Sequence, residues 1–341
     1  MKKLLNSLVL LSFICFTGCN QVSQDIGFVS PDEIYQQQDL STFSKRKNNL
    51  RADWFETLSP ELQKYYESAK GKTGAALFDA LHNIISQNNK IIEYQDSKSY
   101  MYATADNVTV NNTTGLFDIY SYIFIPGSGG NGNLYKESAD ENNDGHPNDF
   151  INCEHTWPQS FFGKQLPMVA DLHHLFPSAS VPNAMRSNNA FGEANKDNRM
   201  VIYTTEGKSG SKLGVIDSKH RSLEELKKLI NLPYEQRPNL EKELDEVFEP
   251  GDRQKGNTAR AMLYFYLRYF NQNIRMGDFQ DNQFWDSKVS VFTKWSEETD
   301  LVDEMEKRRH EFAFKKQGNR NPFIDIPGLA SLIGEDVFKA K

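Results

Sequence analysis

The sequence predicts an α+β protein that is mainly helical and has a single domain over residues 51–341. Two segments with apolar residues at helical spacing, 74–86 and 259–270, favour amphipathic helices. One run of aromatic and β-branched residues, 117–125, favours a buried strand. The length alone suggests two domains, but no linker rich in Pro, Gly or Ser divides 51–341. One domain is therefore expected.

The first eighteen residues have the features of a secretory signal. Lys2 and Lys3 give a positive start, and residues 4–16 are mostly apolar. Phe-Thr-Gly-Cys at 16–19 resembles the lipobox of bacterial lipoproteins, in which the cysteine is acylated and becomes the mature N-terminus. An ordinary signal peptide that contains a cysteine is the alternative. We expect a lipoprotein signal peptide at 1–18 and a lipid on Cys19 that anchors the protein without spanning the membrane.

Residues 19–50 are polar and rich in Gln, Ser and Asn, and they predict a flexible tether. The domain then begins with a helix start at Ser59-Pro60, where Ser caps and Pro takes the first helical position. In the helix predicted for 74–86, leucines and isoleucines recur at three and four residues. His82 falls off this apolar face, so a surface or boundary position is expected for it.

A loop rich in Gly and Asn follows the predicted strand, and the next loop resembles half of a calcium site. Asp140, Asn142 and Asp144 alternate and are followed by Gly145, a pattern that suits Ca²⁺ because it supplies oxygen ligands and a sharp turn. The twelfth position is Ile151 where a calcium loop would need Glu. A structural Ca²⁺ site and a plain solvated turn both remain open.

Further helices are predicted for 222–232 and 259–270, with a short last helix after 319–325. No stretch beyond the signal reaches the roughly 18 apolar residues of a transmembrane helix. Of the three cysteines, processing would remove Cys15 and acylate Cys19, which leaves Cys153 alone. We therefore expect no internal disulfide and no zinc site built on paired cysteines.

The formal net charge is −7, and it becomes −9 when Lys2 and Lys3 are removed with the signal. This balance argues against a generic nucleic-acid binder, which is usually basic. The segment 307–320 is an exception, because it holds six basic residues and one acid. Such a run is either a solvated face or a phosphate contact.

The residue types with the clearest chemistry lie between 153 and 188. Glu154 and the amide oxygen of Asn183 are hard donors of the kind that Mg²⁺ prefers, and His155 titrates near neutral pH. Hydrolysis of a phosphodiester needs a cation to stabilise the developing charge and a base to deprotonate water. The alternatives are a structural histidine and an Asn that only caps a helix.

Several blocks of the sequence resemble the bacterial endonuclease I family of secreted nucleases, which belongs to the ββα-metal, or His-Me finger, class. The central blocks are Glu154-His155-Thr156-Trp157-Pro158-Gln159-Ser160, Asp171-Leu172-His173-His174-Leu175-Phe176-Pro177 and Asn183-x-x-Arg186-Ser187-Asn188-Asn189. Further blocks lie at 77–94, 118–121, 248–260 and 317–323. The resemblance covers roughly residues 55–335 and implies an endonuclease I-like catalytic domain over 51–341, built around a ββα-metal finger.

The resemblance also implies roles for single residues. His155 would be the general base at the end of the first strand of the finger, and Glu154 would bind the metal. Asn183, on the helix, would be the other protein ligand. Residues 171–176 would form the second strand, and His173 and His174 would be structural.

The resemblance identifies no residue of this chain that corresponds to the arginine that polarises the scissile phosphate. A disulfide-bearing insert that carries this Arg in another branch of the family is absent here. Arg186 is our first candidate for the catalytic role and Arg320 the second, although both could be salt-bridged scaffold. Arg320, Asn188 and Lys255 are candidates for substrate binding.

Together these observations predict a non-specific endonuclease that depends on Mg²⁺, with Mn²⁺ or Ca²⁺ as possible substitutes. It would hydrolyse DNA and RNA to 5′-phosphate products. We expect an exported monomer, either a lipoprotein of the bacterial outer membrane or cell surface, or a periplasmic or extracellular protein.

Two other functions remain open on the sequence alone. One is a surface lipoprotein that binds nucleic acid but whose catalytic site has lapsed. The other is a hydrolase with zinc on His155, His173 and His174. The second fits less well, because adjacent side chains on a strand point to opposite faces.

Overall fold

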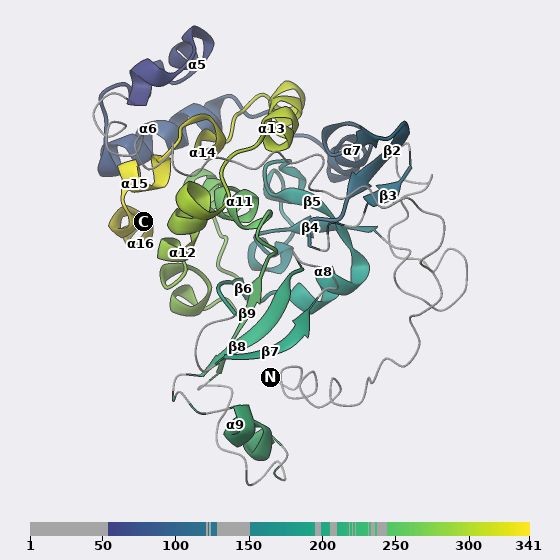
Figure 1. Ribbon diagram of the computed structural model, residues 1–341. Coiled ribbons are helices and arrows are strands. Elements are labelled where there is room, and N and C mark those ends of the chain that lie inside the picture. Colours follow the sequence, from purple (N-terminus) through teal and green to yellow (C-terminus); the bar gives the residue numbers. More distant parts are fainter. Residues whose placement is uncertain are drawn as a thin grey trace.

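The computed structural model describes residues 54–120, 122, 124–127, 151–194, 199–204, 210–217, 219, 221, 223–230, 232, 236 and 244–341. The predicted signal peptide, Cys19, the tether and the calcium-like loop of Asp140, Asn142 and Asp144 lie outside these residues. The described part mixes helices with small sheets, which confirms the α+β class (Figure 1). Among the described helices, none has both the length and the hydropathy needed to cross a bilayer.

Helices form the larger part of the regular structure, and most of them gather in one part of the molecule, beside the sheets (Figure 1). The α-helices are α5 (Pro60–Tyr65), α6 (Gly74–Gln87), α7 (Tyr94–Tyr100), α8 (Ser180–Arg186), α9 (Leu223–Ile230), α11 (Lys255–Tyr269), α12 (Val289–Lys294), α13 (Glu304–Gln317), α14 (Pro322–Asp325), α15 (Leu329–Ile333) and α16 (Glu335–Ala340). Short 3-10 turns are η1 (Trp54–Thr57), η2 (Glu67–Ala69), η5 (Gln159–Phe162) and η6 (Met168–Ala170), and π-helical turns are η3 (Met101–Ala105), η8 (Asn282–Asp286) and η9 (Trp295–Thr299).

The strands form three small sheets. The first is antiparallel, with the order β1 (Val108–Val110), β2 (Thr113–Phe117) and β3 (Phe124–Pro126). The second pairs β4 (Ile151–His155) with β5 (Leu175–Ala179), also antiparallel. The third has the order β6 (Ala190–Phe191), β9 (Leu244–Glu249), β8 (Lys212–Asp217) and β7 (Arg199–Thr204), in which only β6–β9 is parallel.

The main helix predictions are confirmed. Helix α5 begins at Pro60, and the Ser59 hydroxyl accepts from the Leu62 amide as its cap. Helix α6 matches the predicted 74–86 segment within one residue. The predicted 259–270 helix corresponds to α11, which begins earlier, at Lys255, and is buried almost all round. A helix buried on every side lies at the centre of the fold. The apolar face seen in the sequence did not show that the opposite face is buried as well.

The prediction of one continuous strand over 117–125 is wrong. Strand β2 ends at Phe117 and β3 begins at Phe124. Between them Asp118 turns inward and accepts from the Ala179 amide at 2.6 Å, and the Tyr120 hydroxyl reaches Glu154. The chain turns here, because the Tyr122 amide donates to the Asp118 carbonyl at 2.9 Å and Tyr122 has a positive φ of 58°, which a strand does not contain.

The second strand of the hairpin also lies later than the family resemblance implied. Strand β5 begins at Leu175, not at Asp171. Residues 171–174 instead form a turn, closed by the His174 amide donating to the Asp171 carbonyl at 3.2 Å. The Asp171 carboxylate accepts from the His173 amide within the same turn, and this local bond competes with strand pairing.

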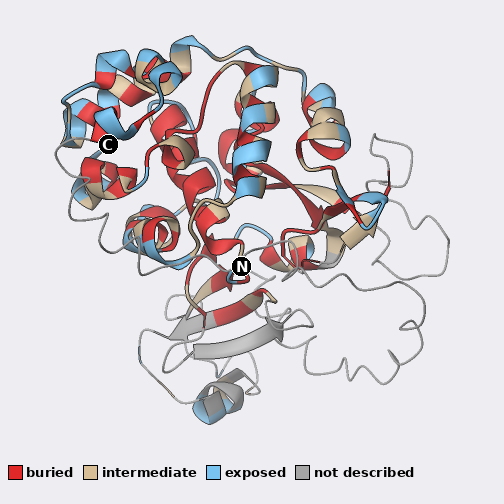
Figure 2. Cartoon of the chain, turned by 45° about the horizontal axis from the view of Figure 1, so that its top comes forward, coloured by how far each residue is buried: buried red, intermediate tan, exposed pale blue. Residues whose placement is uncertain are grey.

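An aromatic cluster around Trp157 joins the hairpin to the helical part. The indole is fully buried and stacks on Phe265 at 5.1 Å and on Phe279 at 5.7 Å between ring centroids. Its Nε1–H donates to the Ile274 carbonyl. Buried residues concentrate along the interior elements, while the outward faces of the helices are exposed (Figure 2). Trp157, two residues after His155 in the sequence, is thus part of the hydrophobic core.

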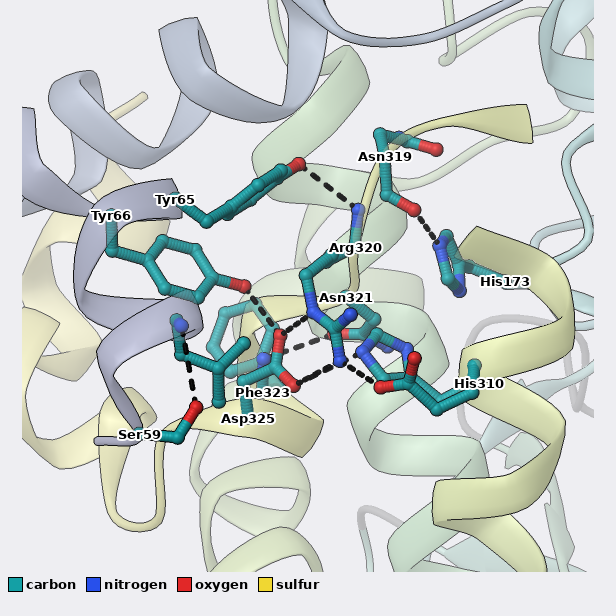
Figure 3. A network of polar contacts seen from close by, with 12 residues as sticks. Ser59, Tyr65, Tyr66, His173, His310, Asn319, Arg320, Asn321, Phe323 and Asp325 are labelled. Carbon is teal, nitrogen blue, oxygen red and sulfur yellow. Dashed lines mark hydrogen bonds and ion pairs between the residues drawn. The ribbon is translucent and has the colours of Figure 1, made fainter. Parts of the chain in front are cut away.

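A second contact between distant segments is polar and centres on Asp325 (Figure 3). Its carboxylate accepts from Tyr66, His310 and two nitrogens of Arg320, at 2.6–3.1 Å. Burial by itself would raise the pKa of Asp325, but His310 and Arg320 hold that pKa well below its usual range. This network fastens α5 and α13 to the turn that carries α14.

We expect Asp325→Asn to lower the free energy of unfolding by about 3–5 kcal/mol, because it leaves the buried Arg320 guanidinium without its main counter-charge. The matched control is Glu311→Gln. Glu311 also pairs with Arg320 but is half exposed, so its loss should cost no more than about 1 kcal/mol. Urea unfolding of both variants measures the difference, and equal losses would contradict the central role of Asp325.

Candidate active site

The candidate site is built on an antiparallel hairpin followed directly by a helix. Strands β4 and β5 pair so that Glu154 lies opposite Phe176 and His155 opposite Leu175. Helix α8 follows β5 without a loop and packs against both strands. Glu154 and His155 thus lie at the end of β4, where neighbouring side chains extend to opposite faces, and Asn183 lies on the helix packed against this strand.

Glu154 is buried and held by two donors. The Tyr120 hydroxyl donates to Oε1 at 2.8 Å, and Nη1 of Arg186 lies 3.2 Å from the same oxygen. Burial raises the pKa of the Glu154 carboxyl, while Arg186 and the Tyr120 hydroxyl act in the opposite direction. Among the described residues, no other side chain donates to this carboxylate.

Arg186 is itself enclosed by the protein, with an exposed fraction of 1%. Its guanidinium donates to the carbonyls of His155, Thr156 and Ser187, at 2.5–3.3 Å. It also lies over the Phe191 ring, 4.4 Å from the centroid. Of the two roles left open by the sequence, this geometry favours the scaffold: Arg186 ties the end of β4 to the end of α8.

Asn183 lies on α8 three residues before Arg186. Residues three apart on a helix share a face, and Arg186 contacts the Glu154 carboxylate from this face. Asn183 therefore shares the face of α8 that carries Arg186, and it is only partly buried. Its amide oxygen and the carboxylate of Glu154 are both hard donors, which fits a divalent cation such as Mg²⁺.

His155 is buried at the end of β4, and its Nε2 lies 3.1 Å from the Val169 carbonyl. A carbonyl only accepts, so the neutral ring carries its proton on Nε2 and its lone pair on Nδ1. Burial lowers the pKa of His155 to about 3, and the neighbouring His174 adds to the effect. The ring is therefore neutral at physiological pH and can accept a proton on Nδ1.

Three consecutive carbonyls of η6 fix the surroundings of this ring. The Met168 carbonyl accepts from Nε2 of His174 at 2.7 Å, the Val169 carbonyl from His155, and the Ala170 carbonyl from the Ser97 hydroxyl at 2.6 Å. The connection between β4 and β5 is thus tied both to the base and to α7. It sets the tautomer and the orientation of His155.

Asp171, the next residue, is a buried carboxylate with a full set of donors. Tyr264 and Tyr269 of α11 both donate to Oδ2 at 2.7 Å, while Gln317 and the His173 amide donate to Oδ1. Burial by itself would raise the pKa of Asp171, but the adjacent histidines and these hydrogen bonds hold that pKa below its usual value.

His173 and His174 point to different carbonyls, those of Asn319 and Met168. Their separate directions give them no common ligand with His155. Within the part of the chain that the structure describes, no cluster of three or more His, Cys, Asp or Glu side chains could hold a metal. The geometry therefore gives no support to the zinc hydrolase alternative.

The other predicted substrate-binding residues have different surroundings. Arg320 is bound to Asp325 and Glu311, and Lys255 to Glu249 and Asp252, so both cations take part in internal ion pairs. Asn188 is exposed just after α8 and remains available for a ligand. It follows Ser187, whose positive φ of 51° is unusual for a residue other than Gly.

Most of the basic run at 307–320 also serves the fold. Arg308 donates to the carbonyls of residues 104, 105 and 107, and Arg309 pairs with Asp106 and lies over the Phe176 ring. Lys307 pairs with Glu304 on the surface. The basic residues of this run therefore do not identify which residues contact phosphate.

The sequence reasoning missed Tyr120 as a contact of the site. The residue lay within a block that resembled the family, Asp118 to Ser121, but its spacing from Glu154 carried no signal. The aromatic run around it favoured a strand, which hid the turn that aims its hydroxyl at the carboxylate.

Comparisons with known proteins identify the family of this chain. A family model described as endonuclease I matches residues 73–225 and 234–328. An extracellular ribonuclease of Bacillus amyloliquefaciens is 30% identical over 286 residues, covering 81% of this chain and 80% of that protein. An extracellular ribonuclease of Bacillus subtilis (strain 168) is 28% identical over 279 residues, with 79% and 77% covered.

The fold, the site and these matches define a nuclease, a hydrolase of phosphodiester bonds. More closely, the chain belongs to the endonuclease I family, whose model covers most of it. Both long blocks of the match contain residues described above, the hairpin with α8 in the first and α11 with α13 in the second.

We expect acid to destabilise the fold from about pH 6.5 downward. Burial lowers the pKa of His155 and His173 to about 3 and that of His174 to about 4. Below about 6.5 the unfolded chain therefore binds protons that the folded chain does not, so stability present above that pH is lost towards pH 4. Each such group contributes a slope of about 1.4 kcal/mol per pH unit.

Urea unfolding at a series of pH values from 7.5 to 4 measures this slope. His174→Gln should lower this slope by the contribution of roughly one proton. The control is His82→Gln, whose ring is only partly buried and should matter less. A free energy of unfolding that stays constant between pH 6.5 and 5 would contradict the prediction.

Proposed function

We propose that this protein is an exported, divalent-metal-dependent endonuclease that hydrolyses DNA and RNA, with 5′-phosphate products. One observation carries the proposal. A neutral histidine, His155, has Nε2 fixed to a carbonyl at the end of a strand, next in sequence to the buried Glu154, and the helix that carries Asn183 packs against that strand. The β4–β5–α8 unit would then be the ββα-metal finger of the family.

Glu154 and Asn183 would hold the cation. The fit is chemical, because a carboxylate and a carboxamide are hard oxygen donors, and they come from a strand and from the helix packed against it. When bound, a divalent ion there neutralises charge that develops on the phosphoryl oxygens and the leaving oxygen. Mg²⁺ is the proposed ion, with Mn²⁺ or Ca²⁺ as possible substitutes.

His155 would take the proton of the attacking water on Nδ1. With a pKa of about 3 in the free protein, the ring is always neutral but is a weak base. An anionic phosphodiester bound nearby would raise this pKa, because opposite charge favours the imidazolium. The base would thus gain strength when substrate is present. Nε2–H, donated to Val169, would keep the ring in place during transfer.

Substrate breadth and location are also part of the proposal. Contacts limited to the phosphate backbone carry no sequence information and would give low specificity. Both named relatives are ribonucleases and are called extracellular, which supports RNA as a substrate and export. The sequence around Cys19 adds a lipid anchor, and fractionation of a Cys19→Ser variant into the membrane fraction would count against the anchor.

Purified protein should degrade both plasmid DNA and RNA with Mg²⁺ and neither substrate in the presence of EDTA. The physical reason is that without the cation nothing neutralises the charge of the leaving oxygen. Release of acid-soluble nucleotides measures the rate, and mapping of the new termini tests for 5′-phosphates. Binding of DNA without cleavage under any divalent metal would favour the lapsed, binding-only function instead.

In the same assay, His155→Ala should lower the rate by at least about 100-fold, since removal of a general base typically costs 10²–10⁴-fold. The control is His82→Ala. The His82 ring contacts the Leu267 carbonyl of α11, so its removal should leave the cleavage rate nearly unchanged. Near-wild-type cleavage by His155→Ala, purified free of host nucleases, would end the proposed mechanism.

A further inference from the structure

The Glu154 carboxylate is held asymmetrically. Both side chains that reach it, Tyr120 at 2.8 Å and Arg186 at 3.2 Å, contact the same oxygen, Oε1. In the described part of the chain, no side chain donates to Oε2, and the only other hydrogen bond to the carboxylate comes from the His155 backbone. A carboxylate held in this way cannot rotate freely about its last bond, because rotation would break both contacts.

The two donors are themselves fixed. The guanidinium of Arg186 is anchored by three backbone carbonyls and the Phe191 ring, as described above. Tyr120 is completely buried, and its ring packs on Phe248 of β9, with 4.8 Å between centroids. Neither donor can follow the carboxylate if it turns.

The backbone of Tyr120 is held from behind as well. The buried Ser211 hydroxyl donates to the Tyr120 carbonyl at 2.9 Å and accepts from the Gly251 amide at 3.2 Å. Ser211 immediately precedes β8, and Gly251 follows β9 closely. A path of hydrogen bonds thus leads from the four-stranded sheet through Tyr120 to one oxygen of Glu154.

We propose that Tyr120 is a positioning residue for the metal site: together with Arg186 it occupies Oε1 of Glu154 and thereby presents Oε2 as the single ligand oxygen towards Asn183. The inference rests on the proposed function, because it concerns the ion that Glu154 and Asn183 would share. Tyr120 does not touch substrate or metal in this role. Its hydroxyl sets the direction of a ligand, and its loss should weaken metal binding more than the chemical step.

The test is Tyr120→Phe, with Mn²⁺ binding measured by isothermal titration calorimetry on the folded protein. We expect the dissociation constant for Mn²⁺ to rise about 10–100-fold, the usual effect of removing a partner of a metal ligand. Nuclease activity should show a matching rise in the Mn²⁺ concentration that gives half the maximal rate. At saturating Mn²⁺ most of the maximal rate should return, a rescue that His155→Ala should not show.

The matched control is Tyr66→Phe. It removes a buried tyrosine hydroxyl from another buried carboxylate, that of Asp325, at a similar distance of 2.6 Å. The dissociation constant for Mn²⁺ should stay within about twofold of wild type, since no group of the proposed site is touched. Equal weakening by both variants would show a general loosening of the fold and would overturn the role of Tyr120.

Two further outcomes separate the inference from the function on which it rests. Wild-type affinity in Tyr120→Phe, with a wild-type protein that binds Mn²⁺ and cleaves, would overturn the inference and leave the function intact. A wild-type protein that neither binds Mn²⁺ nor cleaves would overturn the function itself. If Tyr120→Phe does not fold, Ser211→Ala provides the second test: a rise of a few-fold in the dissociation constant is expected, and no change would count against the proposal.

Discussion

The buried carboxylate of Asp171 is the interaction on which the site depends. It has no cation as a direct partner and is stabilised instead by donors from α11, from the end of α13 and from its own turn. Removing a charge from water is costly unless its lone pairs are satisfied, and here they are. The turn it fixes follows the three carbonyls that orient His155, His174 and α7. The surroundings of the His155 ring are therefore fixed in part by a buried anion.

Sequence reasoning located helices better than strands or the directions of side chains. Periodicity located α6 and most of α11, because burial of an apolar face leaves a regular trace in the sequence. The run at 117–125 misled, because strand propensity describes a half-buried pleated surface and cannot show that Asp118 and Tyr120 have distant polar partners. The family resemblance supplied Glu154, His155 and Asn183, which composition and spacing alone left ambiguous.

The sequence does not show which basic side chains contact phosphate and which stabilise the fold. Arg186, Arg309 and Arg320 each carry a charge that could meet phosphate, yet each is used internally to bind carbonyls or carboxylates. A guanidinium can satisfy several acceptors at once, which makes it an effective cross-link between segments far apart in the chain. The sequence records the charge but not the acceptors, since these are backbone oxygens set by the fold. An acidic chain can therefore be a nuclease without a conspicuous basic surface patch in its sequence.

The position of Trp157 has a consequence for how this protein can vary. The indole begins the aromatic cluster two residues beyond His155, stacked between rings of the helical part. Repacking that cluster would shift the backbone that carries the imidazole, because interiors are dense and transmit small displacements. Substitutions among these interior aromatic residues must therefore preserve the position of the His155 backbone as well as the packed volume of the core. Exposed positions of the outer helices tolerate exchange more readily than this inner layer.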